Sequence, residues 1–139
     1  MGIELRKFEK SDFLNLASIS NDKWEPVHCG LATSMLNATG EVEQCVLALD
    51  DTKIIGYIYG YALPNKNLIP EFLYVLPAYR GGGIGKMLVE ELESSTDCTA
   101  SIIYYNKSLH NYYSEMGYRV GDALEVAIKE ISSRERASE

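Results

Sequence analysis

Four glycines at positions 81–85 separate a short apolar run from an amphipathic helical pattern. Phe72–Val75 is predicted to be a strand, and the apolar residues of Ile84–Leu92 recur with helical periodicity. Glycines let a backbone approach an anion closely, and the free N–H groups of a first helical turn point at that anion. The helix dipole adds positive potential, and Arg80 and Lys86 add full charges. The segment therefore predicts a strand, a phosphate-binding loop and a helix.

Two nucleotide-binding motifs use similar glycines, and the spacing excludes both. A Walker A loop would need glycine where Arg80 stands and a hydroxyl residue where Met87 stands. A dinucleotide-binding fingerprint that starts at Gly81 would need a third glycine at the position of Lys86. Nucleotide hydrolysis and hydride transfer through this loop are therefore excluded.

Two longer segments resemble the GNAT family of N-acetyltransferases. The family's coenzyme A signature, V-x-P-x-Y-R-G-x-G-I-G, is similar at every defined position to Val75-Leu76-Pro77-Ala78-Tyr79-Arg80-Gly81-Gly82-Gly83-Ile84-Gly85. A second family pattern, N-x-x-A-x-x-x-Y-x-x-x-G-F/Y, resembles Asn106 to Tyr118, with Leu109 in place of the small residue. The chain thus resembles a small single-domain member that occupies residues 1–131 and is followed by a polar tail at 132–139.

The resemblance implies that acetyl-CoA is the cosubstrate and that no metal is needed. The residues that it assigns to the coenzyme are Leu73, Tyr74, Val75, Arg80, Gly81, Gly82, Gly83, Ile84, Gly85, Lys86, Asn106 and Tyr113. It implies transfer of an acetyl group directly to a primary amine within a ternary complex. The acceptor is expected to be a small molecule or a peptide, and its identity stays open.

Three residues receive catalytic roles from the resemblance. The backbone N–H of Val75 would bind the acetyl oxygen, as a single-donor oxyanion site. Tyr113 matches the family's general acid, which protonates or hydrogen-bonds the departing thiolate. Glu71 lies four residues before Val75, which predicts the same face of an extended strand, and it is similar to the glutamate that some members use as a base through water.

The rest of the chain predicts a mixture of strands and helices. Strands are predicted at Ile3–Phe8, Gln44–Leu49, Ile54–Leu63, Thr99–Tyr105, Tyr118–Val120 and Leu124–Ile131. Helices are predicted over 12–19, after a cap at Ser11, and over 24–36 and 109–116. Together with the resemblance, this order predicts an α/β (α+β) fold whose mixed, mostly antiparallel central sheet splays at the acetyl-CoA cleft and carries helices on both faces.

The strand at Ile54–Leu63 supports a sheet that is covered on both sides. Side chains alternate along a strand, which predicts Ile55 and the tyrosines at 57, 59 and 61 on one face, and Ile54, Ile58 and the glycines at 56 and 60 on the other. A sheet that helices cover on both sides would explain the apolar residues on both faces. The glycines permit close packing or a bend.

The composition limits the classes of partner that the chain is expected to bind. Twenty acidic against thirteen basic residues give a net charge of −7, which opposes binding to nucleic acid and to anionic membranes. The sequence has no apolar run of bilayer length and does not begin like a signal peptide, so a cytoplasmic location is expected. Cys29, Cys45 and Cys98 are widely spaced, which predicts reduced core thiols and neither a disulfide nor a zinc site.

Several alternatives stay open. A non-catalytic module that binds acyl-CoA would keep the same fold and loop, and a longer acyl donor would use the same signature. The oligomeric state is undecided, with a homodimer among the options. The resemblance places Trp24, His28 and Cys29 beside the acceptor pocket, although packing or surface roles are favoured for all three. For His110, no catalytic triad partner is identified.

Overall fold

The computed structural model describes residues 2–120, 127 and 129, and contacts divide the chain into two compact units, residues 1–104 and 105–139. The strand expected over 124–131 lies outside the described residues except at positions 127 and 129, and so does the whole tail 132–139. Residues 118–120 are described and form no strand. No helix within the described ranges is long and apolar enough to cross a membrane.

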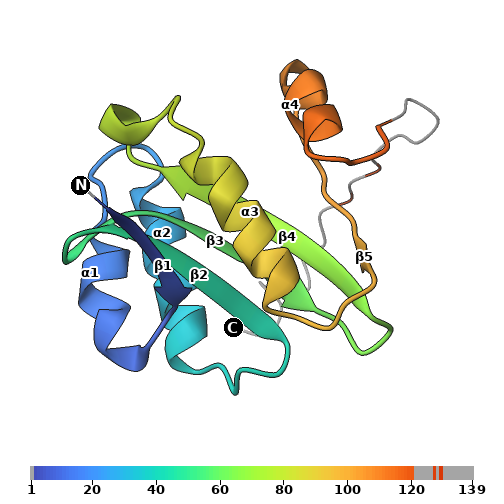
Figure 1. Ribbon diagram of the computed structural model, residues 1–139. Helices are drawn as coiled ribbons and strands as arrows, with labels where there is room; N and C mark the ends of the chain where they lie inside the picture. The colour runs from blue at the N-terminus through green and yellow to red at the C-terminus, as the bar shows by residue number, and fades with distance from the viewer. Residues whose placement is uncertain (1, 121–126, 128, 130–139) are drawn as a thin grey trace. The chain divides into compact units, whose positions relative to one another are not determined.

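The first unit is built on a five-stranded sheet with the strand order β1-β2-β3-β4-β5 (Figure 1). The strands are β1 Ile3–Lys7, β2 Glu43–Asp50, β3 Lys53–Ala62, β4 Asn67–Val75 and β5 Ala100–Ser101. The first four pair in antiparallel fashion, and β5 runs parallel to the beginning of β4. The predicted mixed, mostly antiparallel sheet is therefore confirmed.

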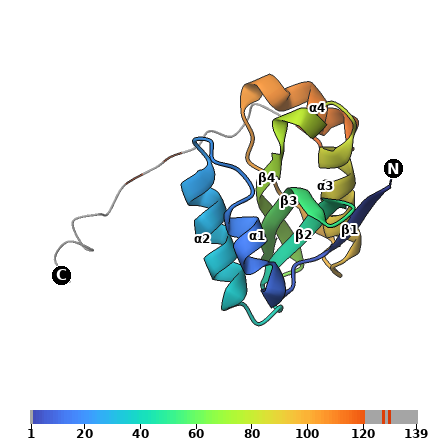
Figure 2. The same ribbon diagram turned by 90° about the vertical axis from the view of Figure 1, so that its left-hand side faces the viewer.

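Helices cover both faces of this sheet (Figure 2). On one face lie α1 Phe13–Ala17 and α2 Glu25–Leu36, and on the other lies α3 Ile84–Ser94, which contacts β2, β3 and β4. Pro26 stands in the first turn of α2, where its missing N–H costs no hydrogen bond. In the second unit, a 3-10 turn at Lys107–Leu109 leads into α4 His110–Glu115.

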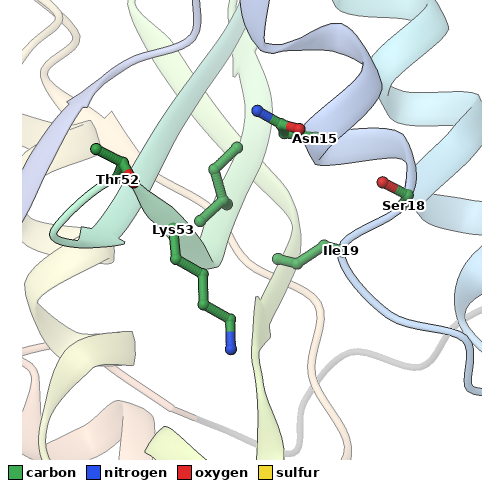
Figure 3. Close-up of a pocket in the computed structure, with 6 residues that line it drawn as sticks. Asn15, Ser18, Ile19, Thr52 and Lys53 are labelled. Carbon is green, nitrogen blue, oxygen red and sulfur yellow. The ribbon is translucent and has the colours of Figure 1, made fainter.

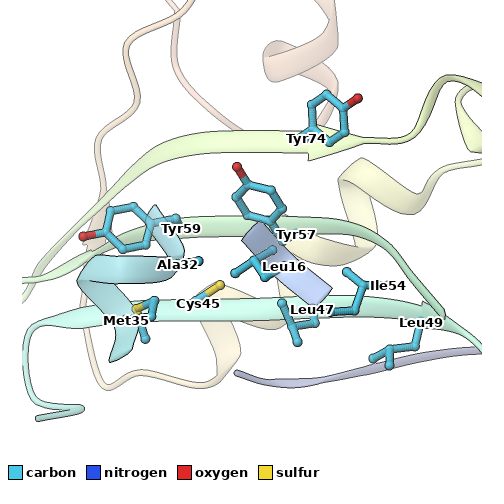
Figure 4. Close-up of a cluster of buried hydrophobic side chains, with 10 residues drawn as sticks. All are labelled: Leu16, Ala32, Met35, Cys45, Leu47, Leu49, Ile54, Tyr57, Tyr59 and Tyr74. Carbon is cyan, nitrogen blue, oxygen red and sulfur yellow. The ribbon is translucent and has the colours of Figure 1, made fainter. Parts of the chain in front are cut away.

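The core on the α1 and α2 side is rich in tyrosine (Figure 4). Tyr57 and Tyr59 are buried and Tyr61 packs against them, as the alternation predicted. The prediction is wrong for Ile54, which packs in the same cluster. Ala48 pairs with Gly56 and Leu49 with Ile54, so the register shift leaves Ile55 without a partner and reverses the alternation there.

A second register shift lies in β4, which begins at Asn67, earlier than the predicted Phe72. Tyr59 pairs with Phe72 and Gly60 with Pro70, which leaves Glu71 as the extra residue. A bulge is one of the few places where a strand accepts proline, because one ladder hydrogen bond is already lost. A Cβ atom on Gly60 would lie 2.5 Å from the Ile69 carbonyl oxygen, so close backbone approach requires glycine.

The first helix begins differently from the prediction. Ser11 does not cap it; instead a 3-10 turn at Lys10–Asp12 precedes α1, and the Asp12 carboxylate accepts the Glu9 N–H at 2.7 Å. Both oxygens of Asp12 also accept hydrogen bonds from Arg6, each at 2.9 Å. These bonds hold the pKa of the Asp12 carboxyl below its usual value. Asp12 therefore ties the helix entry to β1.

The cysteines are free, but they do not all lie in the core. Cys45 is buried in β2, and burial raises the pKa of its thiol. Cys29 is exposed on α2 and Cys98 is partly exposed, so the prediction of core positions is wrong for Cys29.

Candidate active site

The glycine loop is shaped by its backbone. Gly81 has φ +87° and Gly83 has φ +86°, a left-handed conformation that side-chain-bearing residues rarely adopt. A Cβ atom at either position would meet nothing within 4 Å, so the loop is open in front of both glycines. Gly83 is the N-cap of α3, which begins at Ile84. The sequence therefore uses glycine here for conformation and leaves the outer surface of the loop uncovered.

The first turn of α3 leaves backbone donors without helical acceptors. The first bond within this turn runs from the Met87 N–H to the Gly83 carbonyl oxygen at 3.0 Å. The N–H groups of Ile84, Gly85 and Lys86 precede it and have no acceptor within the helix. An open glycine loop, these donors and the exposed Lys86 side chain fit a pyrophosphate group.

Arg80, the cation that precedes these glycines, folds back onto the end of β4. Its Nε atom donates a hydrogen bond of 2.7 Å to the Val75 carbonyl oxygen. The centre of the guanidinium lies 5.4 Å from the centroid of the Tyr74 ring, within the range of a cation–π interaction. The structure thus brings Arg80 together with two other predicted site residues, Tyr74 and Val75.

The backbone of Val75 faces the edge of β4 that is turned away from β3. Residues of an antiparallel ladder direct their N–H and C=O groups alternately toward and away from the partner strand. The Leu76 N–H donates to the Ile55 carbonyl oxygen at 2.8 Å, so Val75 directs its polar groups to the other edge. Within the described residues, β5 pairs with only the first two residues of β4, so it does not pair with Val75.

Glu71 is exposed and lies at the bulge of β4. Because the bulge inserts one residue, counting back from Val75 no longer places the two side chains on one face, and that prediction is wrong. The Glu71 carboxylate accepts a hydrogen bond of 3.2 Å from the Tyr61 hydroxyl. Tyr61 packs against the tyrosine-rich core, so Glu71 lies on the α2 side of the sheet. Leu73, by contrast, pairs with Ile58 in the regular part of the ladder.

The structure adds a polar network that the sequence did not reveal. His28 is fully buried and hydrogen-bonds Tyr57 and Ser20, each at 2.8 Å. Asp22 accepts hydrogen bonds from Ser20 and from the Tyr74 hydroxyl, the latter at 2.6 Å, and the Tyr74 bond lowers the pKa of its carboxyl. Burial lowers the pKa of His28. Tyr57 lies 29 positions from His28 and Tyr74 lies 52 positions from Asp22, so no local pattern connects the two tyrosines with the rest of the network.

Asn106 and Tyr113 belong to the second unit, whereas the other predicted site residues belong to the first. The Asn106 side chain accepts the Ser108 N–H at 2.9 Å and thereby caps the 3-10 turn. Tyr113 is buried beside Tyr105, Tyr112 and Tyr118, with ring centroids 5.0–5.8 Å away. Burial raises the pKa of Tyr113, and Tyr112 adds to this shift, so its hydroxyl keeps its proton at neutral pH.

A separate depression of about 250 Å³ lies between α1 and the β2–β3 hairpin (Figure 3). It is lined by Asn15, Ser18, Ile19, Thr52, Lys53 and Ile54. None of these is a predicted site residue. Among the residues that the structure describes, no group of three or more His, Cys, Asp or Glu side chains is placed to hold a metal ion.

The family model of the acetyltransferase (GNAT) domain matches residues 41–120, more than half of the chain. The chain therefore belongs to the GNAT acetyltransferase family. The match includes β2 to α4 and contains both segments that resemble the family's patterns. Membership of this family supports acyltransferase activity. No curated protein matches the chain.

Solved structures of N-acetyltransferases share the fold. A ribosomal-protein-alanine N-acetyltransferase from Brucella melitensis biovar Abortus 2308 has a TM-score of 0.73 at 16% identity, covering 93% of this chain and 100% of that one. The PaiA N-acetyltransferase from Thermoplasma acidophilum, in complex with coenzyme A, has a TM-score of 0.71 at 21% identity, covering 88% of this chain and 93% of that one. An aminoglycoside N-acetyltransferase in complex with CoA has a TM-score of 0.71 at 15% identity, covering 92% of this chain and 95% of that one. At these identities the likeness shows the fold alone.

Proposed function

We propose that the chain is an N-acetyltransferase that moves an acetyl group from acetyl-CoA to a primary amine by direct transfer in a ternary complex. The observation that carries this proposal is the open glycine loop at the start of α3, with Gly81 and Gly83 at positive φ. Family membership and the complexes of two structural neighbours with coenzyme A support acetyl-CoA as the donor.

Two sets of groups would hold acetyl-CoA: one would bind its pyrophosphate and the other would contact the rest of the coenzyme. The N–H groups at the start of α3 and the Lys86 side chain would bind the pyrophosphate, and the terminal nitrogens of Arg80 would contribute, since its Nε is engaged by Val75. Leu73, Tyr74 and Asn106 would contact the rest of the coenzyme, as the resemblance implies. A loop that holds the phosphates fixes the donor and leaves the acceptor unspecified.

Acetyl transfer requires three groups from the chain: a hydrogen-bond donor for the oxyanion, an acceptor for the amine proton and a proton donor for the thiolate. The neutral amine attacks the thioester carbonyl carbon, a C–N bond forms, the C–S bond breaks, and an amide and a thiolate result. The Val75 N–H, directed to the open edge of β4, would stabilise the oxyanion. The amine loses one proton, which the exposed Glu71 carboxylate or a water would accept. The thiolate gains one proton, which Tyr113 would supply as a neutral phenol.

Replacement of Tyr113 by phenylalanine tests the transfer chemistry. We expect Tyr113→Phe to lower kcat by roughly a hundredfold, the usual contribution of a general acid, while the dissociation constant of acetyl-CoA changes little. Tyr112→Phe is the matched control, because it removes a neighbouring hydroxyl from the same helix, and it should stay within about twofold of the wild type. Release of free thiol from acetyl-CoA with a panel of primary amines measures kcat, and calorimetry measures binding.

Two results would contradict these assignments. Unchanged turnover in Tyr113→Phe would remove Tyr113 from the acid role. Tight binding of acetyl-CoA without thiol release for any amine would favour the non-catalytic acyl-CoA-binding module instead.

A further inference from the structure

The segment between α1 and α2 is tied to the sheet through one continuous set of hydrogen bonds. It runs from Tyr57 on β3 to His28 on α2 at 2.8 Å, from His28 to Ser20 at 2.8 Å, from Ser20 to Asp22 at 2.9 Å, and from Asp22 to Tyr74 on β4 at 2.6 Å. Ser20 and Asp22 lie between the two helices, where the chain has no regular structure. Two strands and one helix therefore hold this segment in place.

The chemistry of the partners fixes the direction of every bond. The Asp22 carboxylate only accepts, so the hydroxyls of Ser20 and Tyr74 both donate to it. Because the Ser20 hydroxyl proton is used in the bond to Asp22, the Ser20 oxygen accepts a hydrogen bond from Nε2–H of His28. His28 Nδ1 then accepts from the Tyr57 hydroxyl. A single tautomer of neutral His28 satisfies the whole set, and His28 is fully buried.

Asp22 is the point where this network reaches the predicted reaction site. It accepts three hydrogen bonds, from Ser20, from the Trp24 N–H at 2.9 Å and from Tyr74. Figure 4 shows Tyr57 and Tyr74 projecting from neighbouring strands of the same sheet. With its hydroxyl held by Asp22, the Tyr74 ring has a fixed position at the end of β4.

The position of Tyr74 affects the direction of the Val75 backbone groups in two ways. The Val75 N–H belongs to the peptide group that joins Tyr74 to Val75, so its direction depends on the backbone of Tyr74. The ring of Tyr74 also lies beneath the Arg80 guanidinium at 5.4 Å, and Arg80 Nε holds the Val75 carbonyl oxygen at 2.7 Å. The groups on both sides of Val75 thus depend on Tyr74.

We propose that Asp22 is a positioning residue for acetyl transfer, which fixes Tyr74 and, through Tyr74 and Arg80, the direction of the Val75 N–H. This inference rests on the proposed function, in which that N–H stabilises the oxyanion. Asp22 acts through Tyr74 and takes no proton. Small displacements of an oriented donor reduce transition-state stabilisation much more than they reduce ground-state binding.

The test is a double-mutant cycle with Asp22→Ala and Tyr74→Phe, each measured by kcat and by the dissociation constant of acetyl-CoA. Each single variant should lower kcat by roughly tenfold and change acetyl-CoA affinity by less than about twofold. The double variant should lose no more than the worse single variant, because both remove the same interaction. Asp22→Asn keeps a side-chain oxygen for Ser20 and Trp24 and can still hydrogen-bond Tyr74, so it should recover most of kcat.

Thr33→Val is the control. It removes a hydroxyl that donates to the Cys29 carbonyl oxygen at 2.9 Å in the same unit, and it should leave kcat within about twofold of the wild type. Three results would overturn the proposal: unchanged kcat in Asp22→Ala with the fold intact, losses in the double variant that multiply, or a loss confined to acetyl-CoA affinity. If Asp22→Ala does not fold, Tyr74→Phe alone decides by the same criteria.

An NMR measurement separates this inference from the proposed function. In the ¹⁵N-labelled chain without coenzyme, Asp22→Ala and Tyr74→Phe should shift the Val75 amide resonance, and Thr33→Val should leave it unchanged. This outcome supports the positioning role even if no amine is acetylated. An unchanged Val75 amide in both variants would overturn the role even if the wild-type chain transfers acetyl groups.

Discussion

At the scale of single residues, glycine serves two different purposes in this chain. Gly81 and Gly83 have positive φ and open space around them, so they are required for backbone conformation. Gly56 and Gly60 have no such φ, but a Cβ atom would lie 2.8 Å or less from a carbonyl oxygen of β4, so they are required for space. Only the first kind leaves a surface on which a ligand can lie.

The two purposes predict separable effects for Gly81. Gly81→Ala and Gly40→Ala both place alanine at φ +87° in open space, and each should lower the free energy of unfolding by about 1 kcal/mol. Only Gly81→Ala should also weaken acetyl-CoA binding, because relief of the strain moves the loop N–H groups. Urea unfolding and calorimetry measure the two quantities. Equal acetyl-CoA affinity for both variants would separate the loop from the coenzyme.

His28 predicts the pH dependence of stability. Burial lowers the pKa of His28 below its usual 6.5, although the charges of Asp22 and Glu25 oppose the shift. The unfolded chain therefore binds the proton more readily, and the free energy of unfolding should fall as the pH falls below about 6.5. The carboxyl groups of Asp12 and Asp22, whose pKa values are also lowered, act in the same direction at lower pH, near 4 and below.

Urea unfolding between pH 7.5 and 5.5 checks this dependence. His28→Gln should flatten the slope, whereas His110→Gln, at an exposed position, should retain it. A slope that persists in His28→Gln would assign the dependence to other groups.

At the scale of elements, the two register shifts decide where side chains point. One reverses the alternation around Ile55, and the other inserts Glu71 and accommodates Pro70 in β4. The second shift places the Glu71 carboxylate beside Tyr61 on the α2 side of the sheet, while Val75 keeps its place in the regular ladder. The geometry at the end of β4 thus depends on backbone contacts around Gly60.

Substitution of Gly60 measures that dependence. In Gly60→Ala the Cβ atom would lie 2.5 Å from the Ile69 carbonyl oxygen and 2.9 Å from Pro70 Cα, which should cost about 2–3 kcal/mol of stability. Gly30→Ala is the control, for which the expected change in stability has the opposite sign. Gly30 lies within α2 with nothing near its Cβ position, so alanine should stabilise by about 0.5–1 kcal/mol. Equal stabilities in urea would contradict the close approach of β3 and β4.

At the scale of the whole molecule, periodicity and short motifs predicted most of the architecture. The order of elements, the glycine loop and the helices on both faces of the sheet follow from local patterns. The bulges do not, because a register shift depends on how two strands meet. The network through Asp22 and Tyr74 joins residues 52 positions apart, which no local pattern can connect. The roles of Glu71 and Tyr113 rest on family resemblance and stay predictions.

We propose that the loop from Arg80 to Gly85 binds the pyrophosphate of acetyl-CoA. Calorimetric titration of the full chain with acetyl-CoA and with acetyl-pantetheine, which has the thioester but no pyrophosphate, tests this assignment. We expect acetyl-CoA to bind about a hundredfold more tightly, a difference of roughly 2.7 kcal/mol, because the loop amides and the cations lose their partner in the truncated donor. Equal affinity for the two donors, or no binding of acetyl-CoA, would show that the loop does not hold the pyrophosphate.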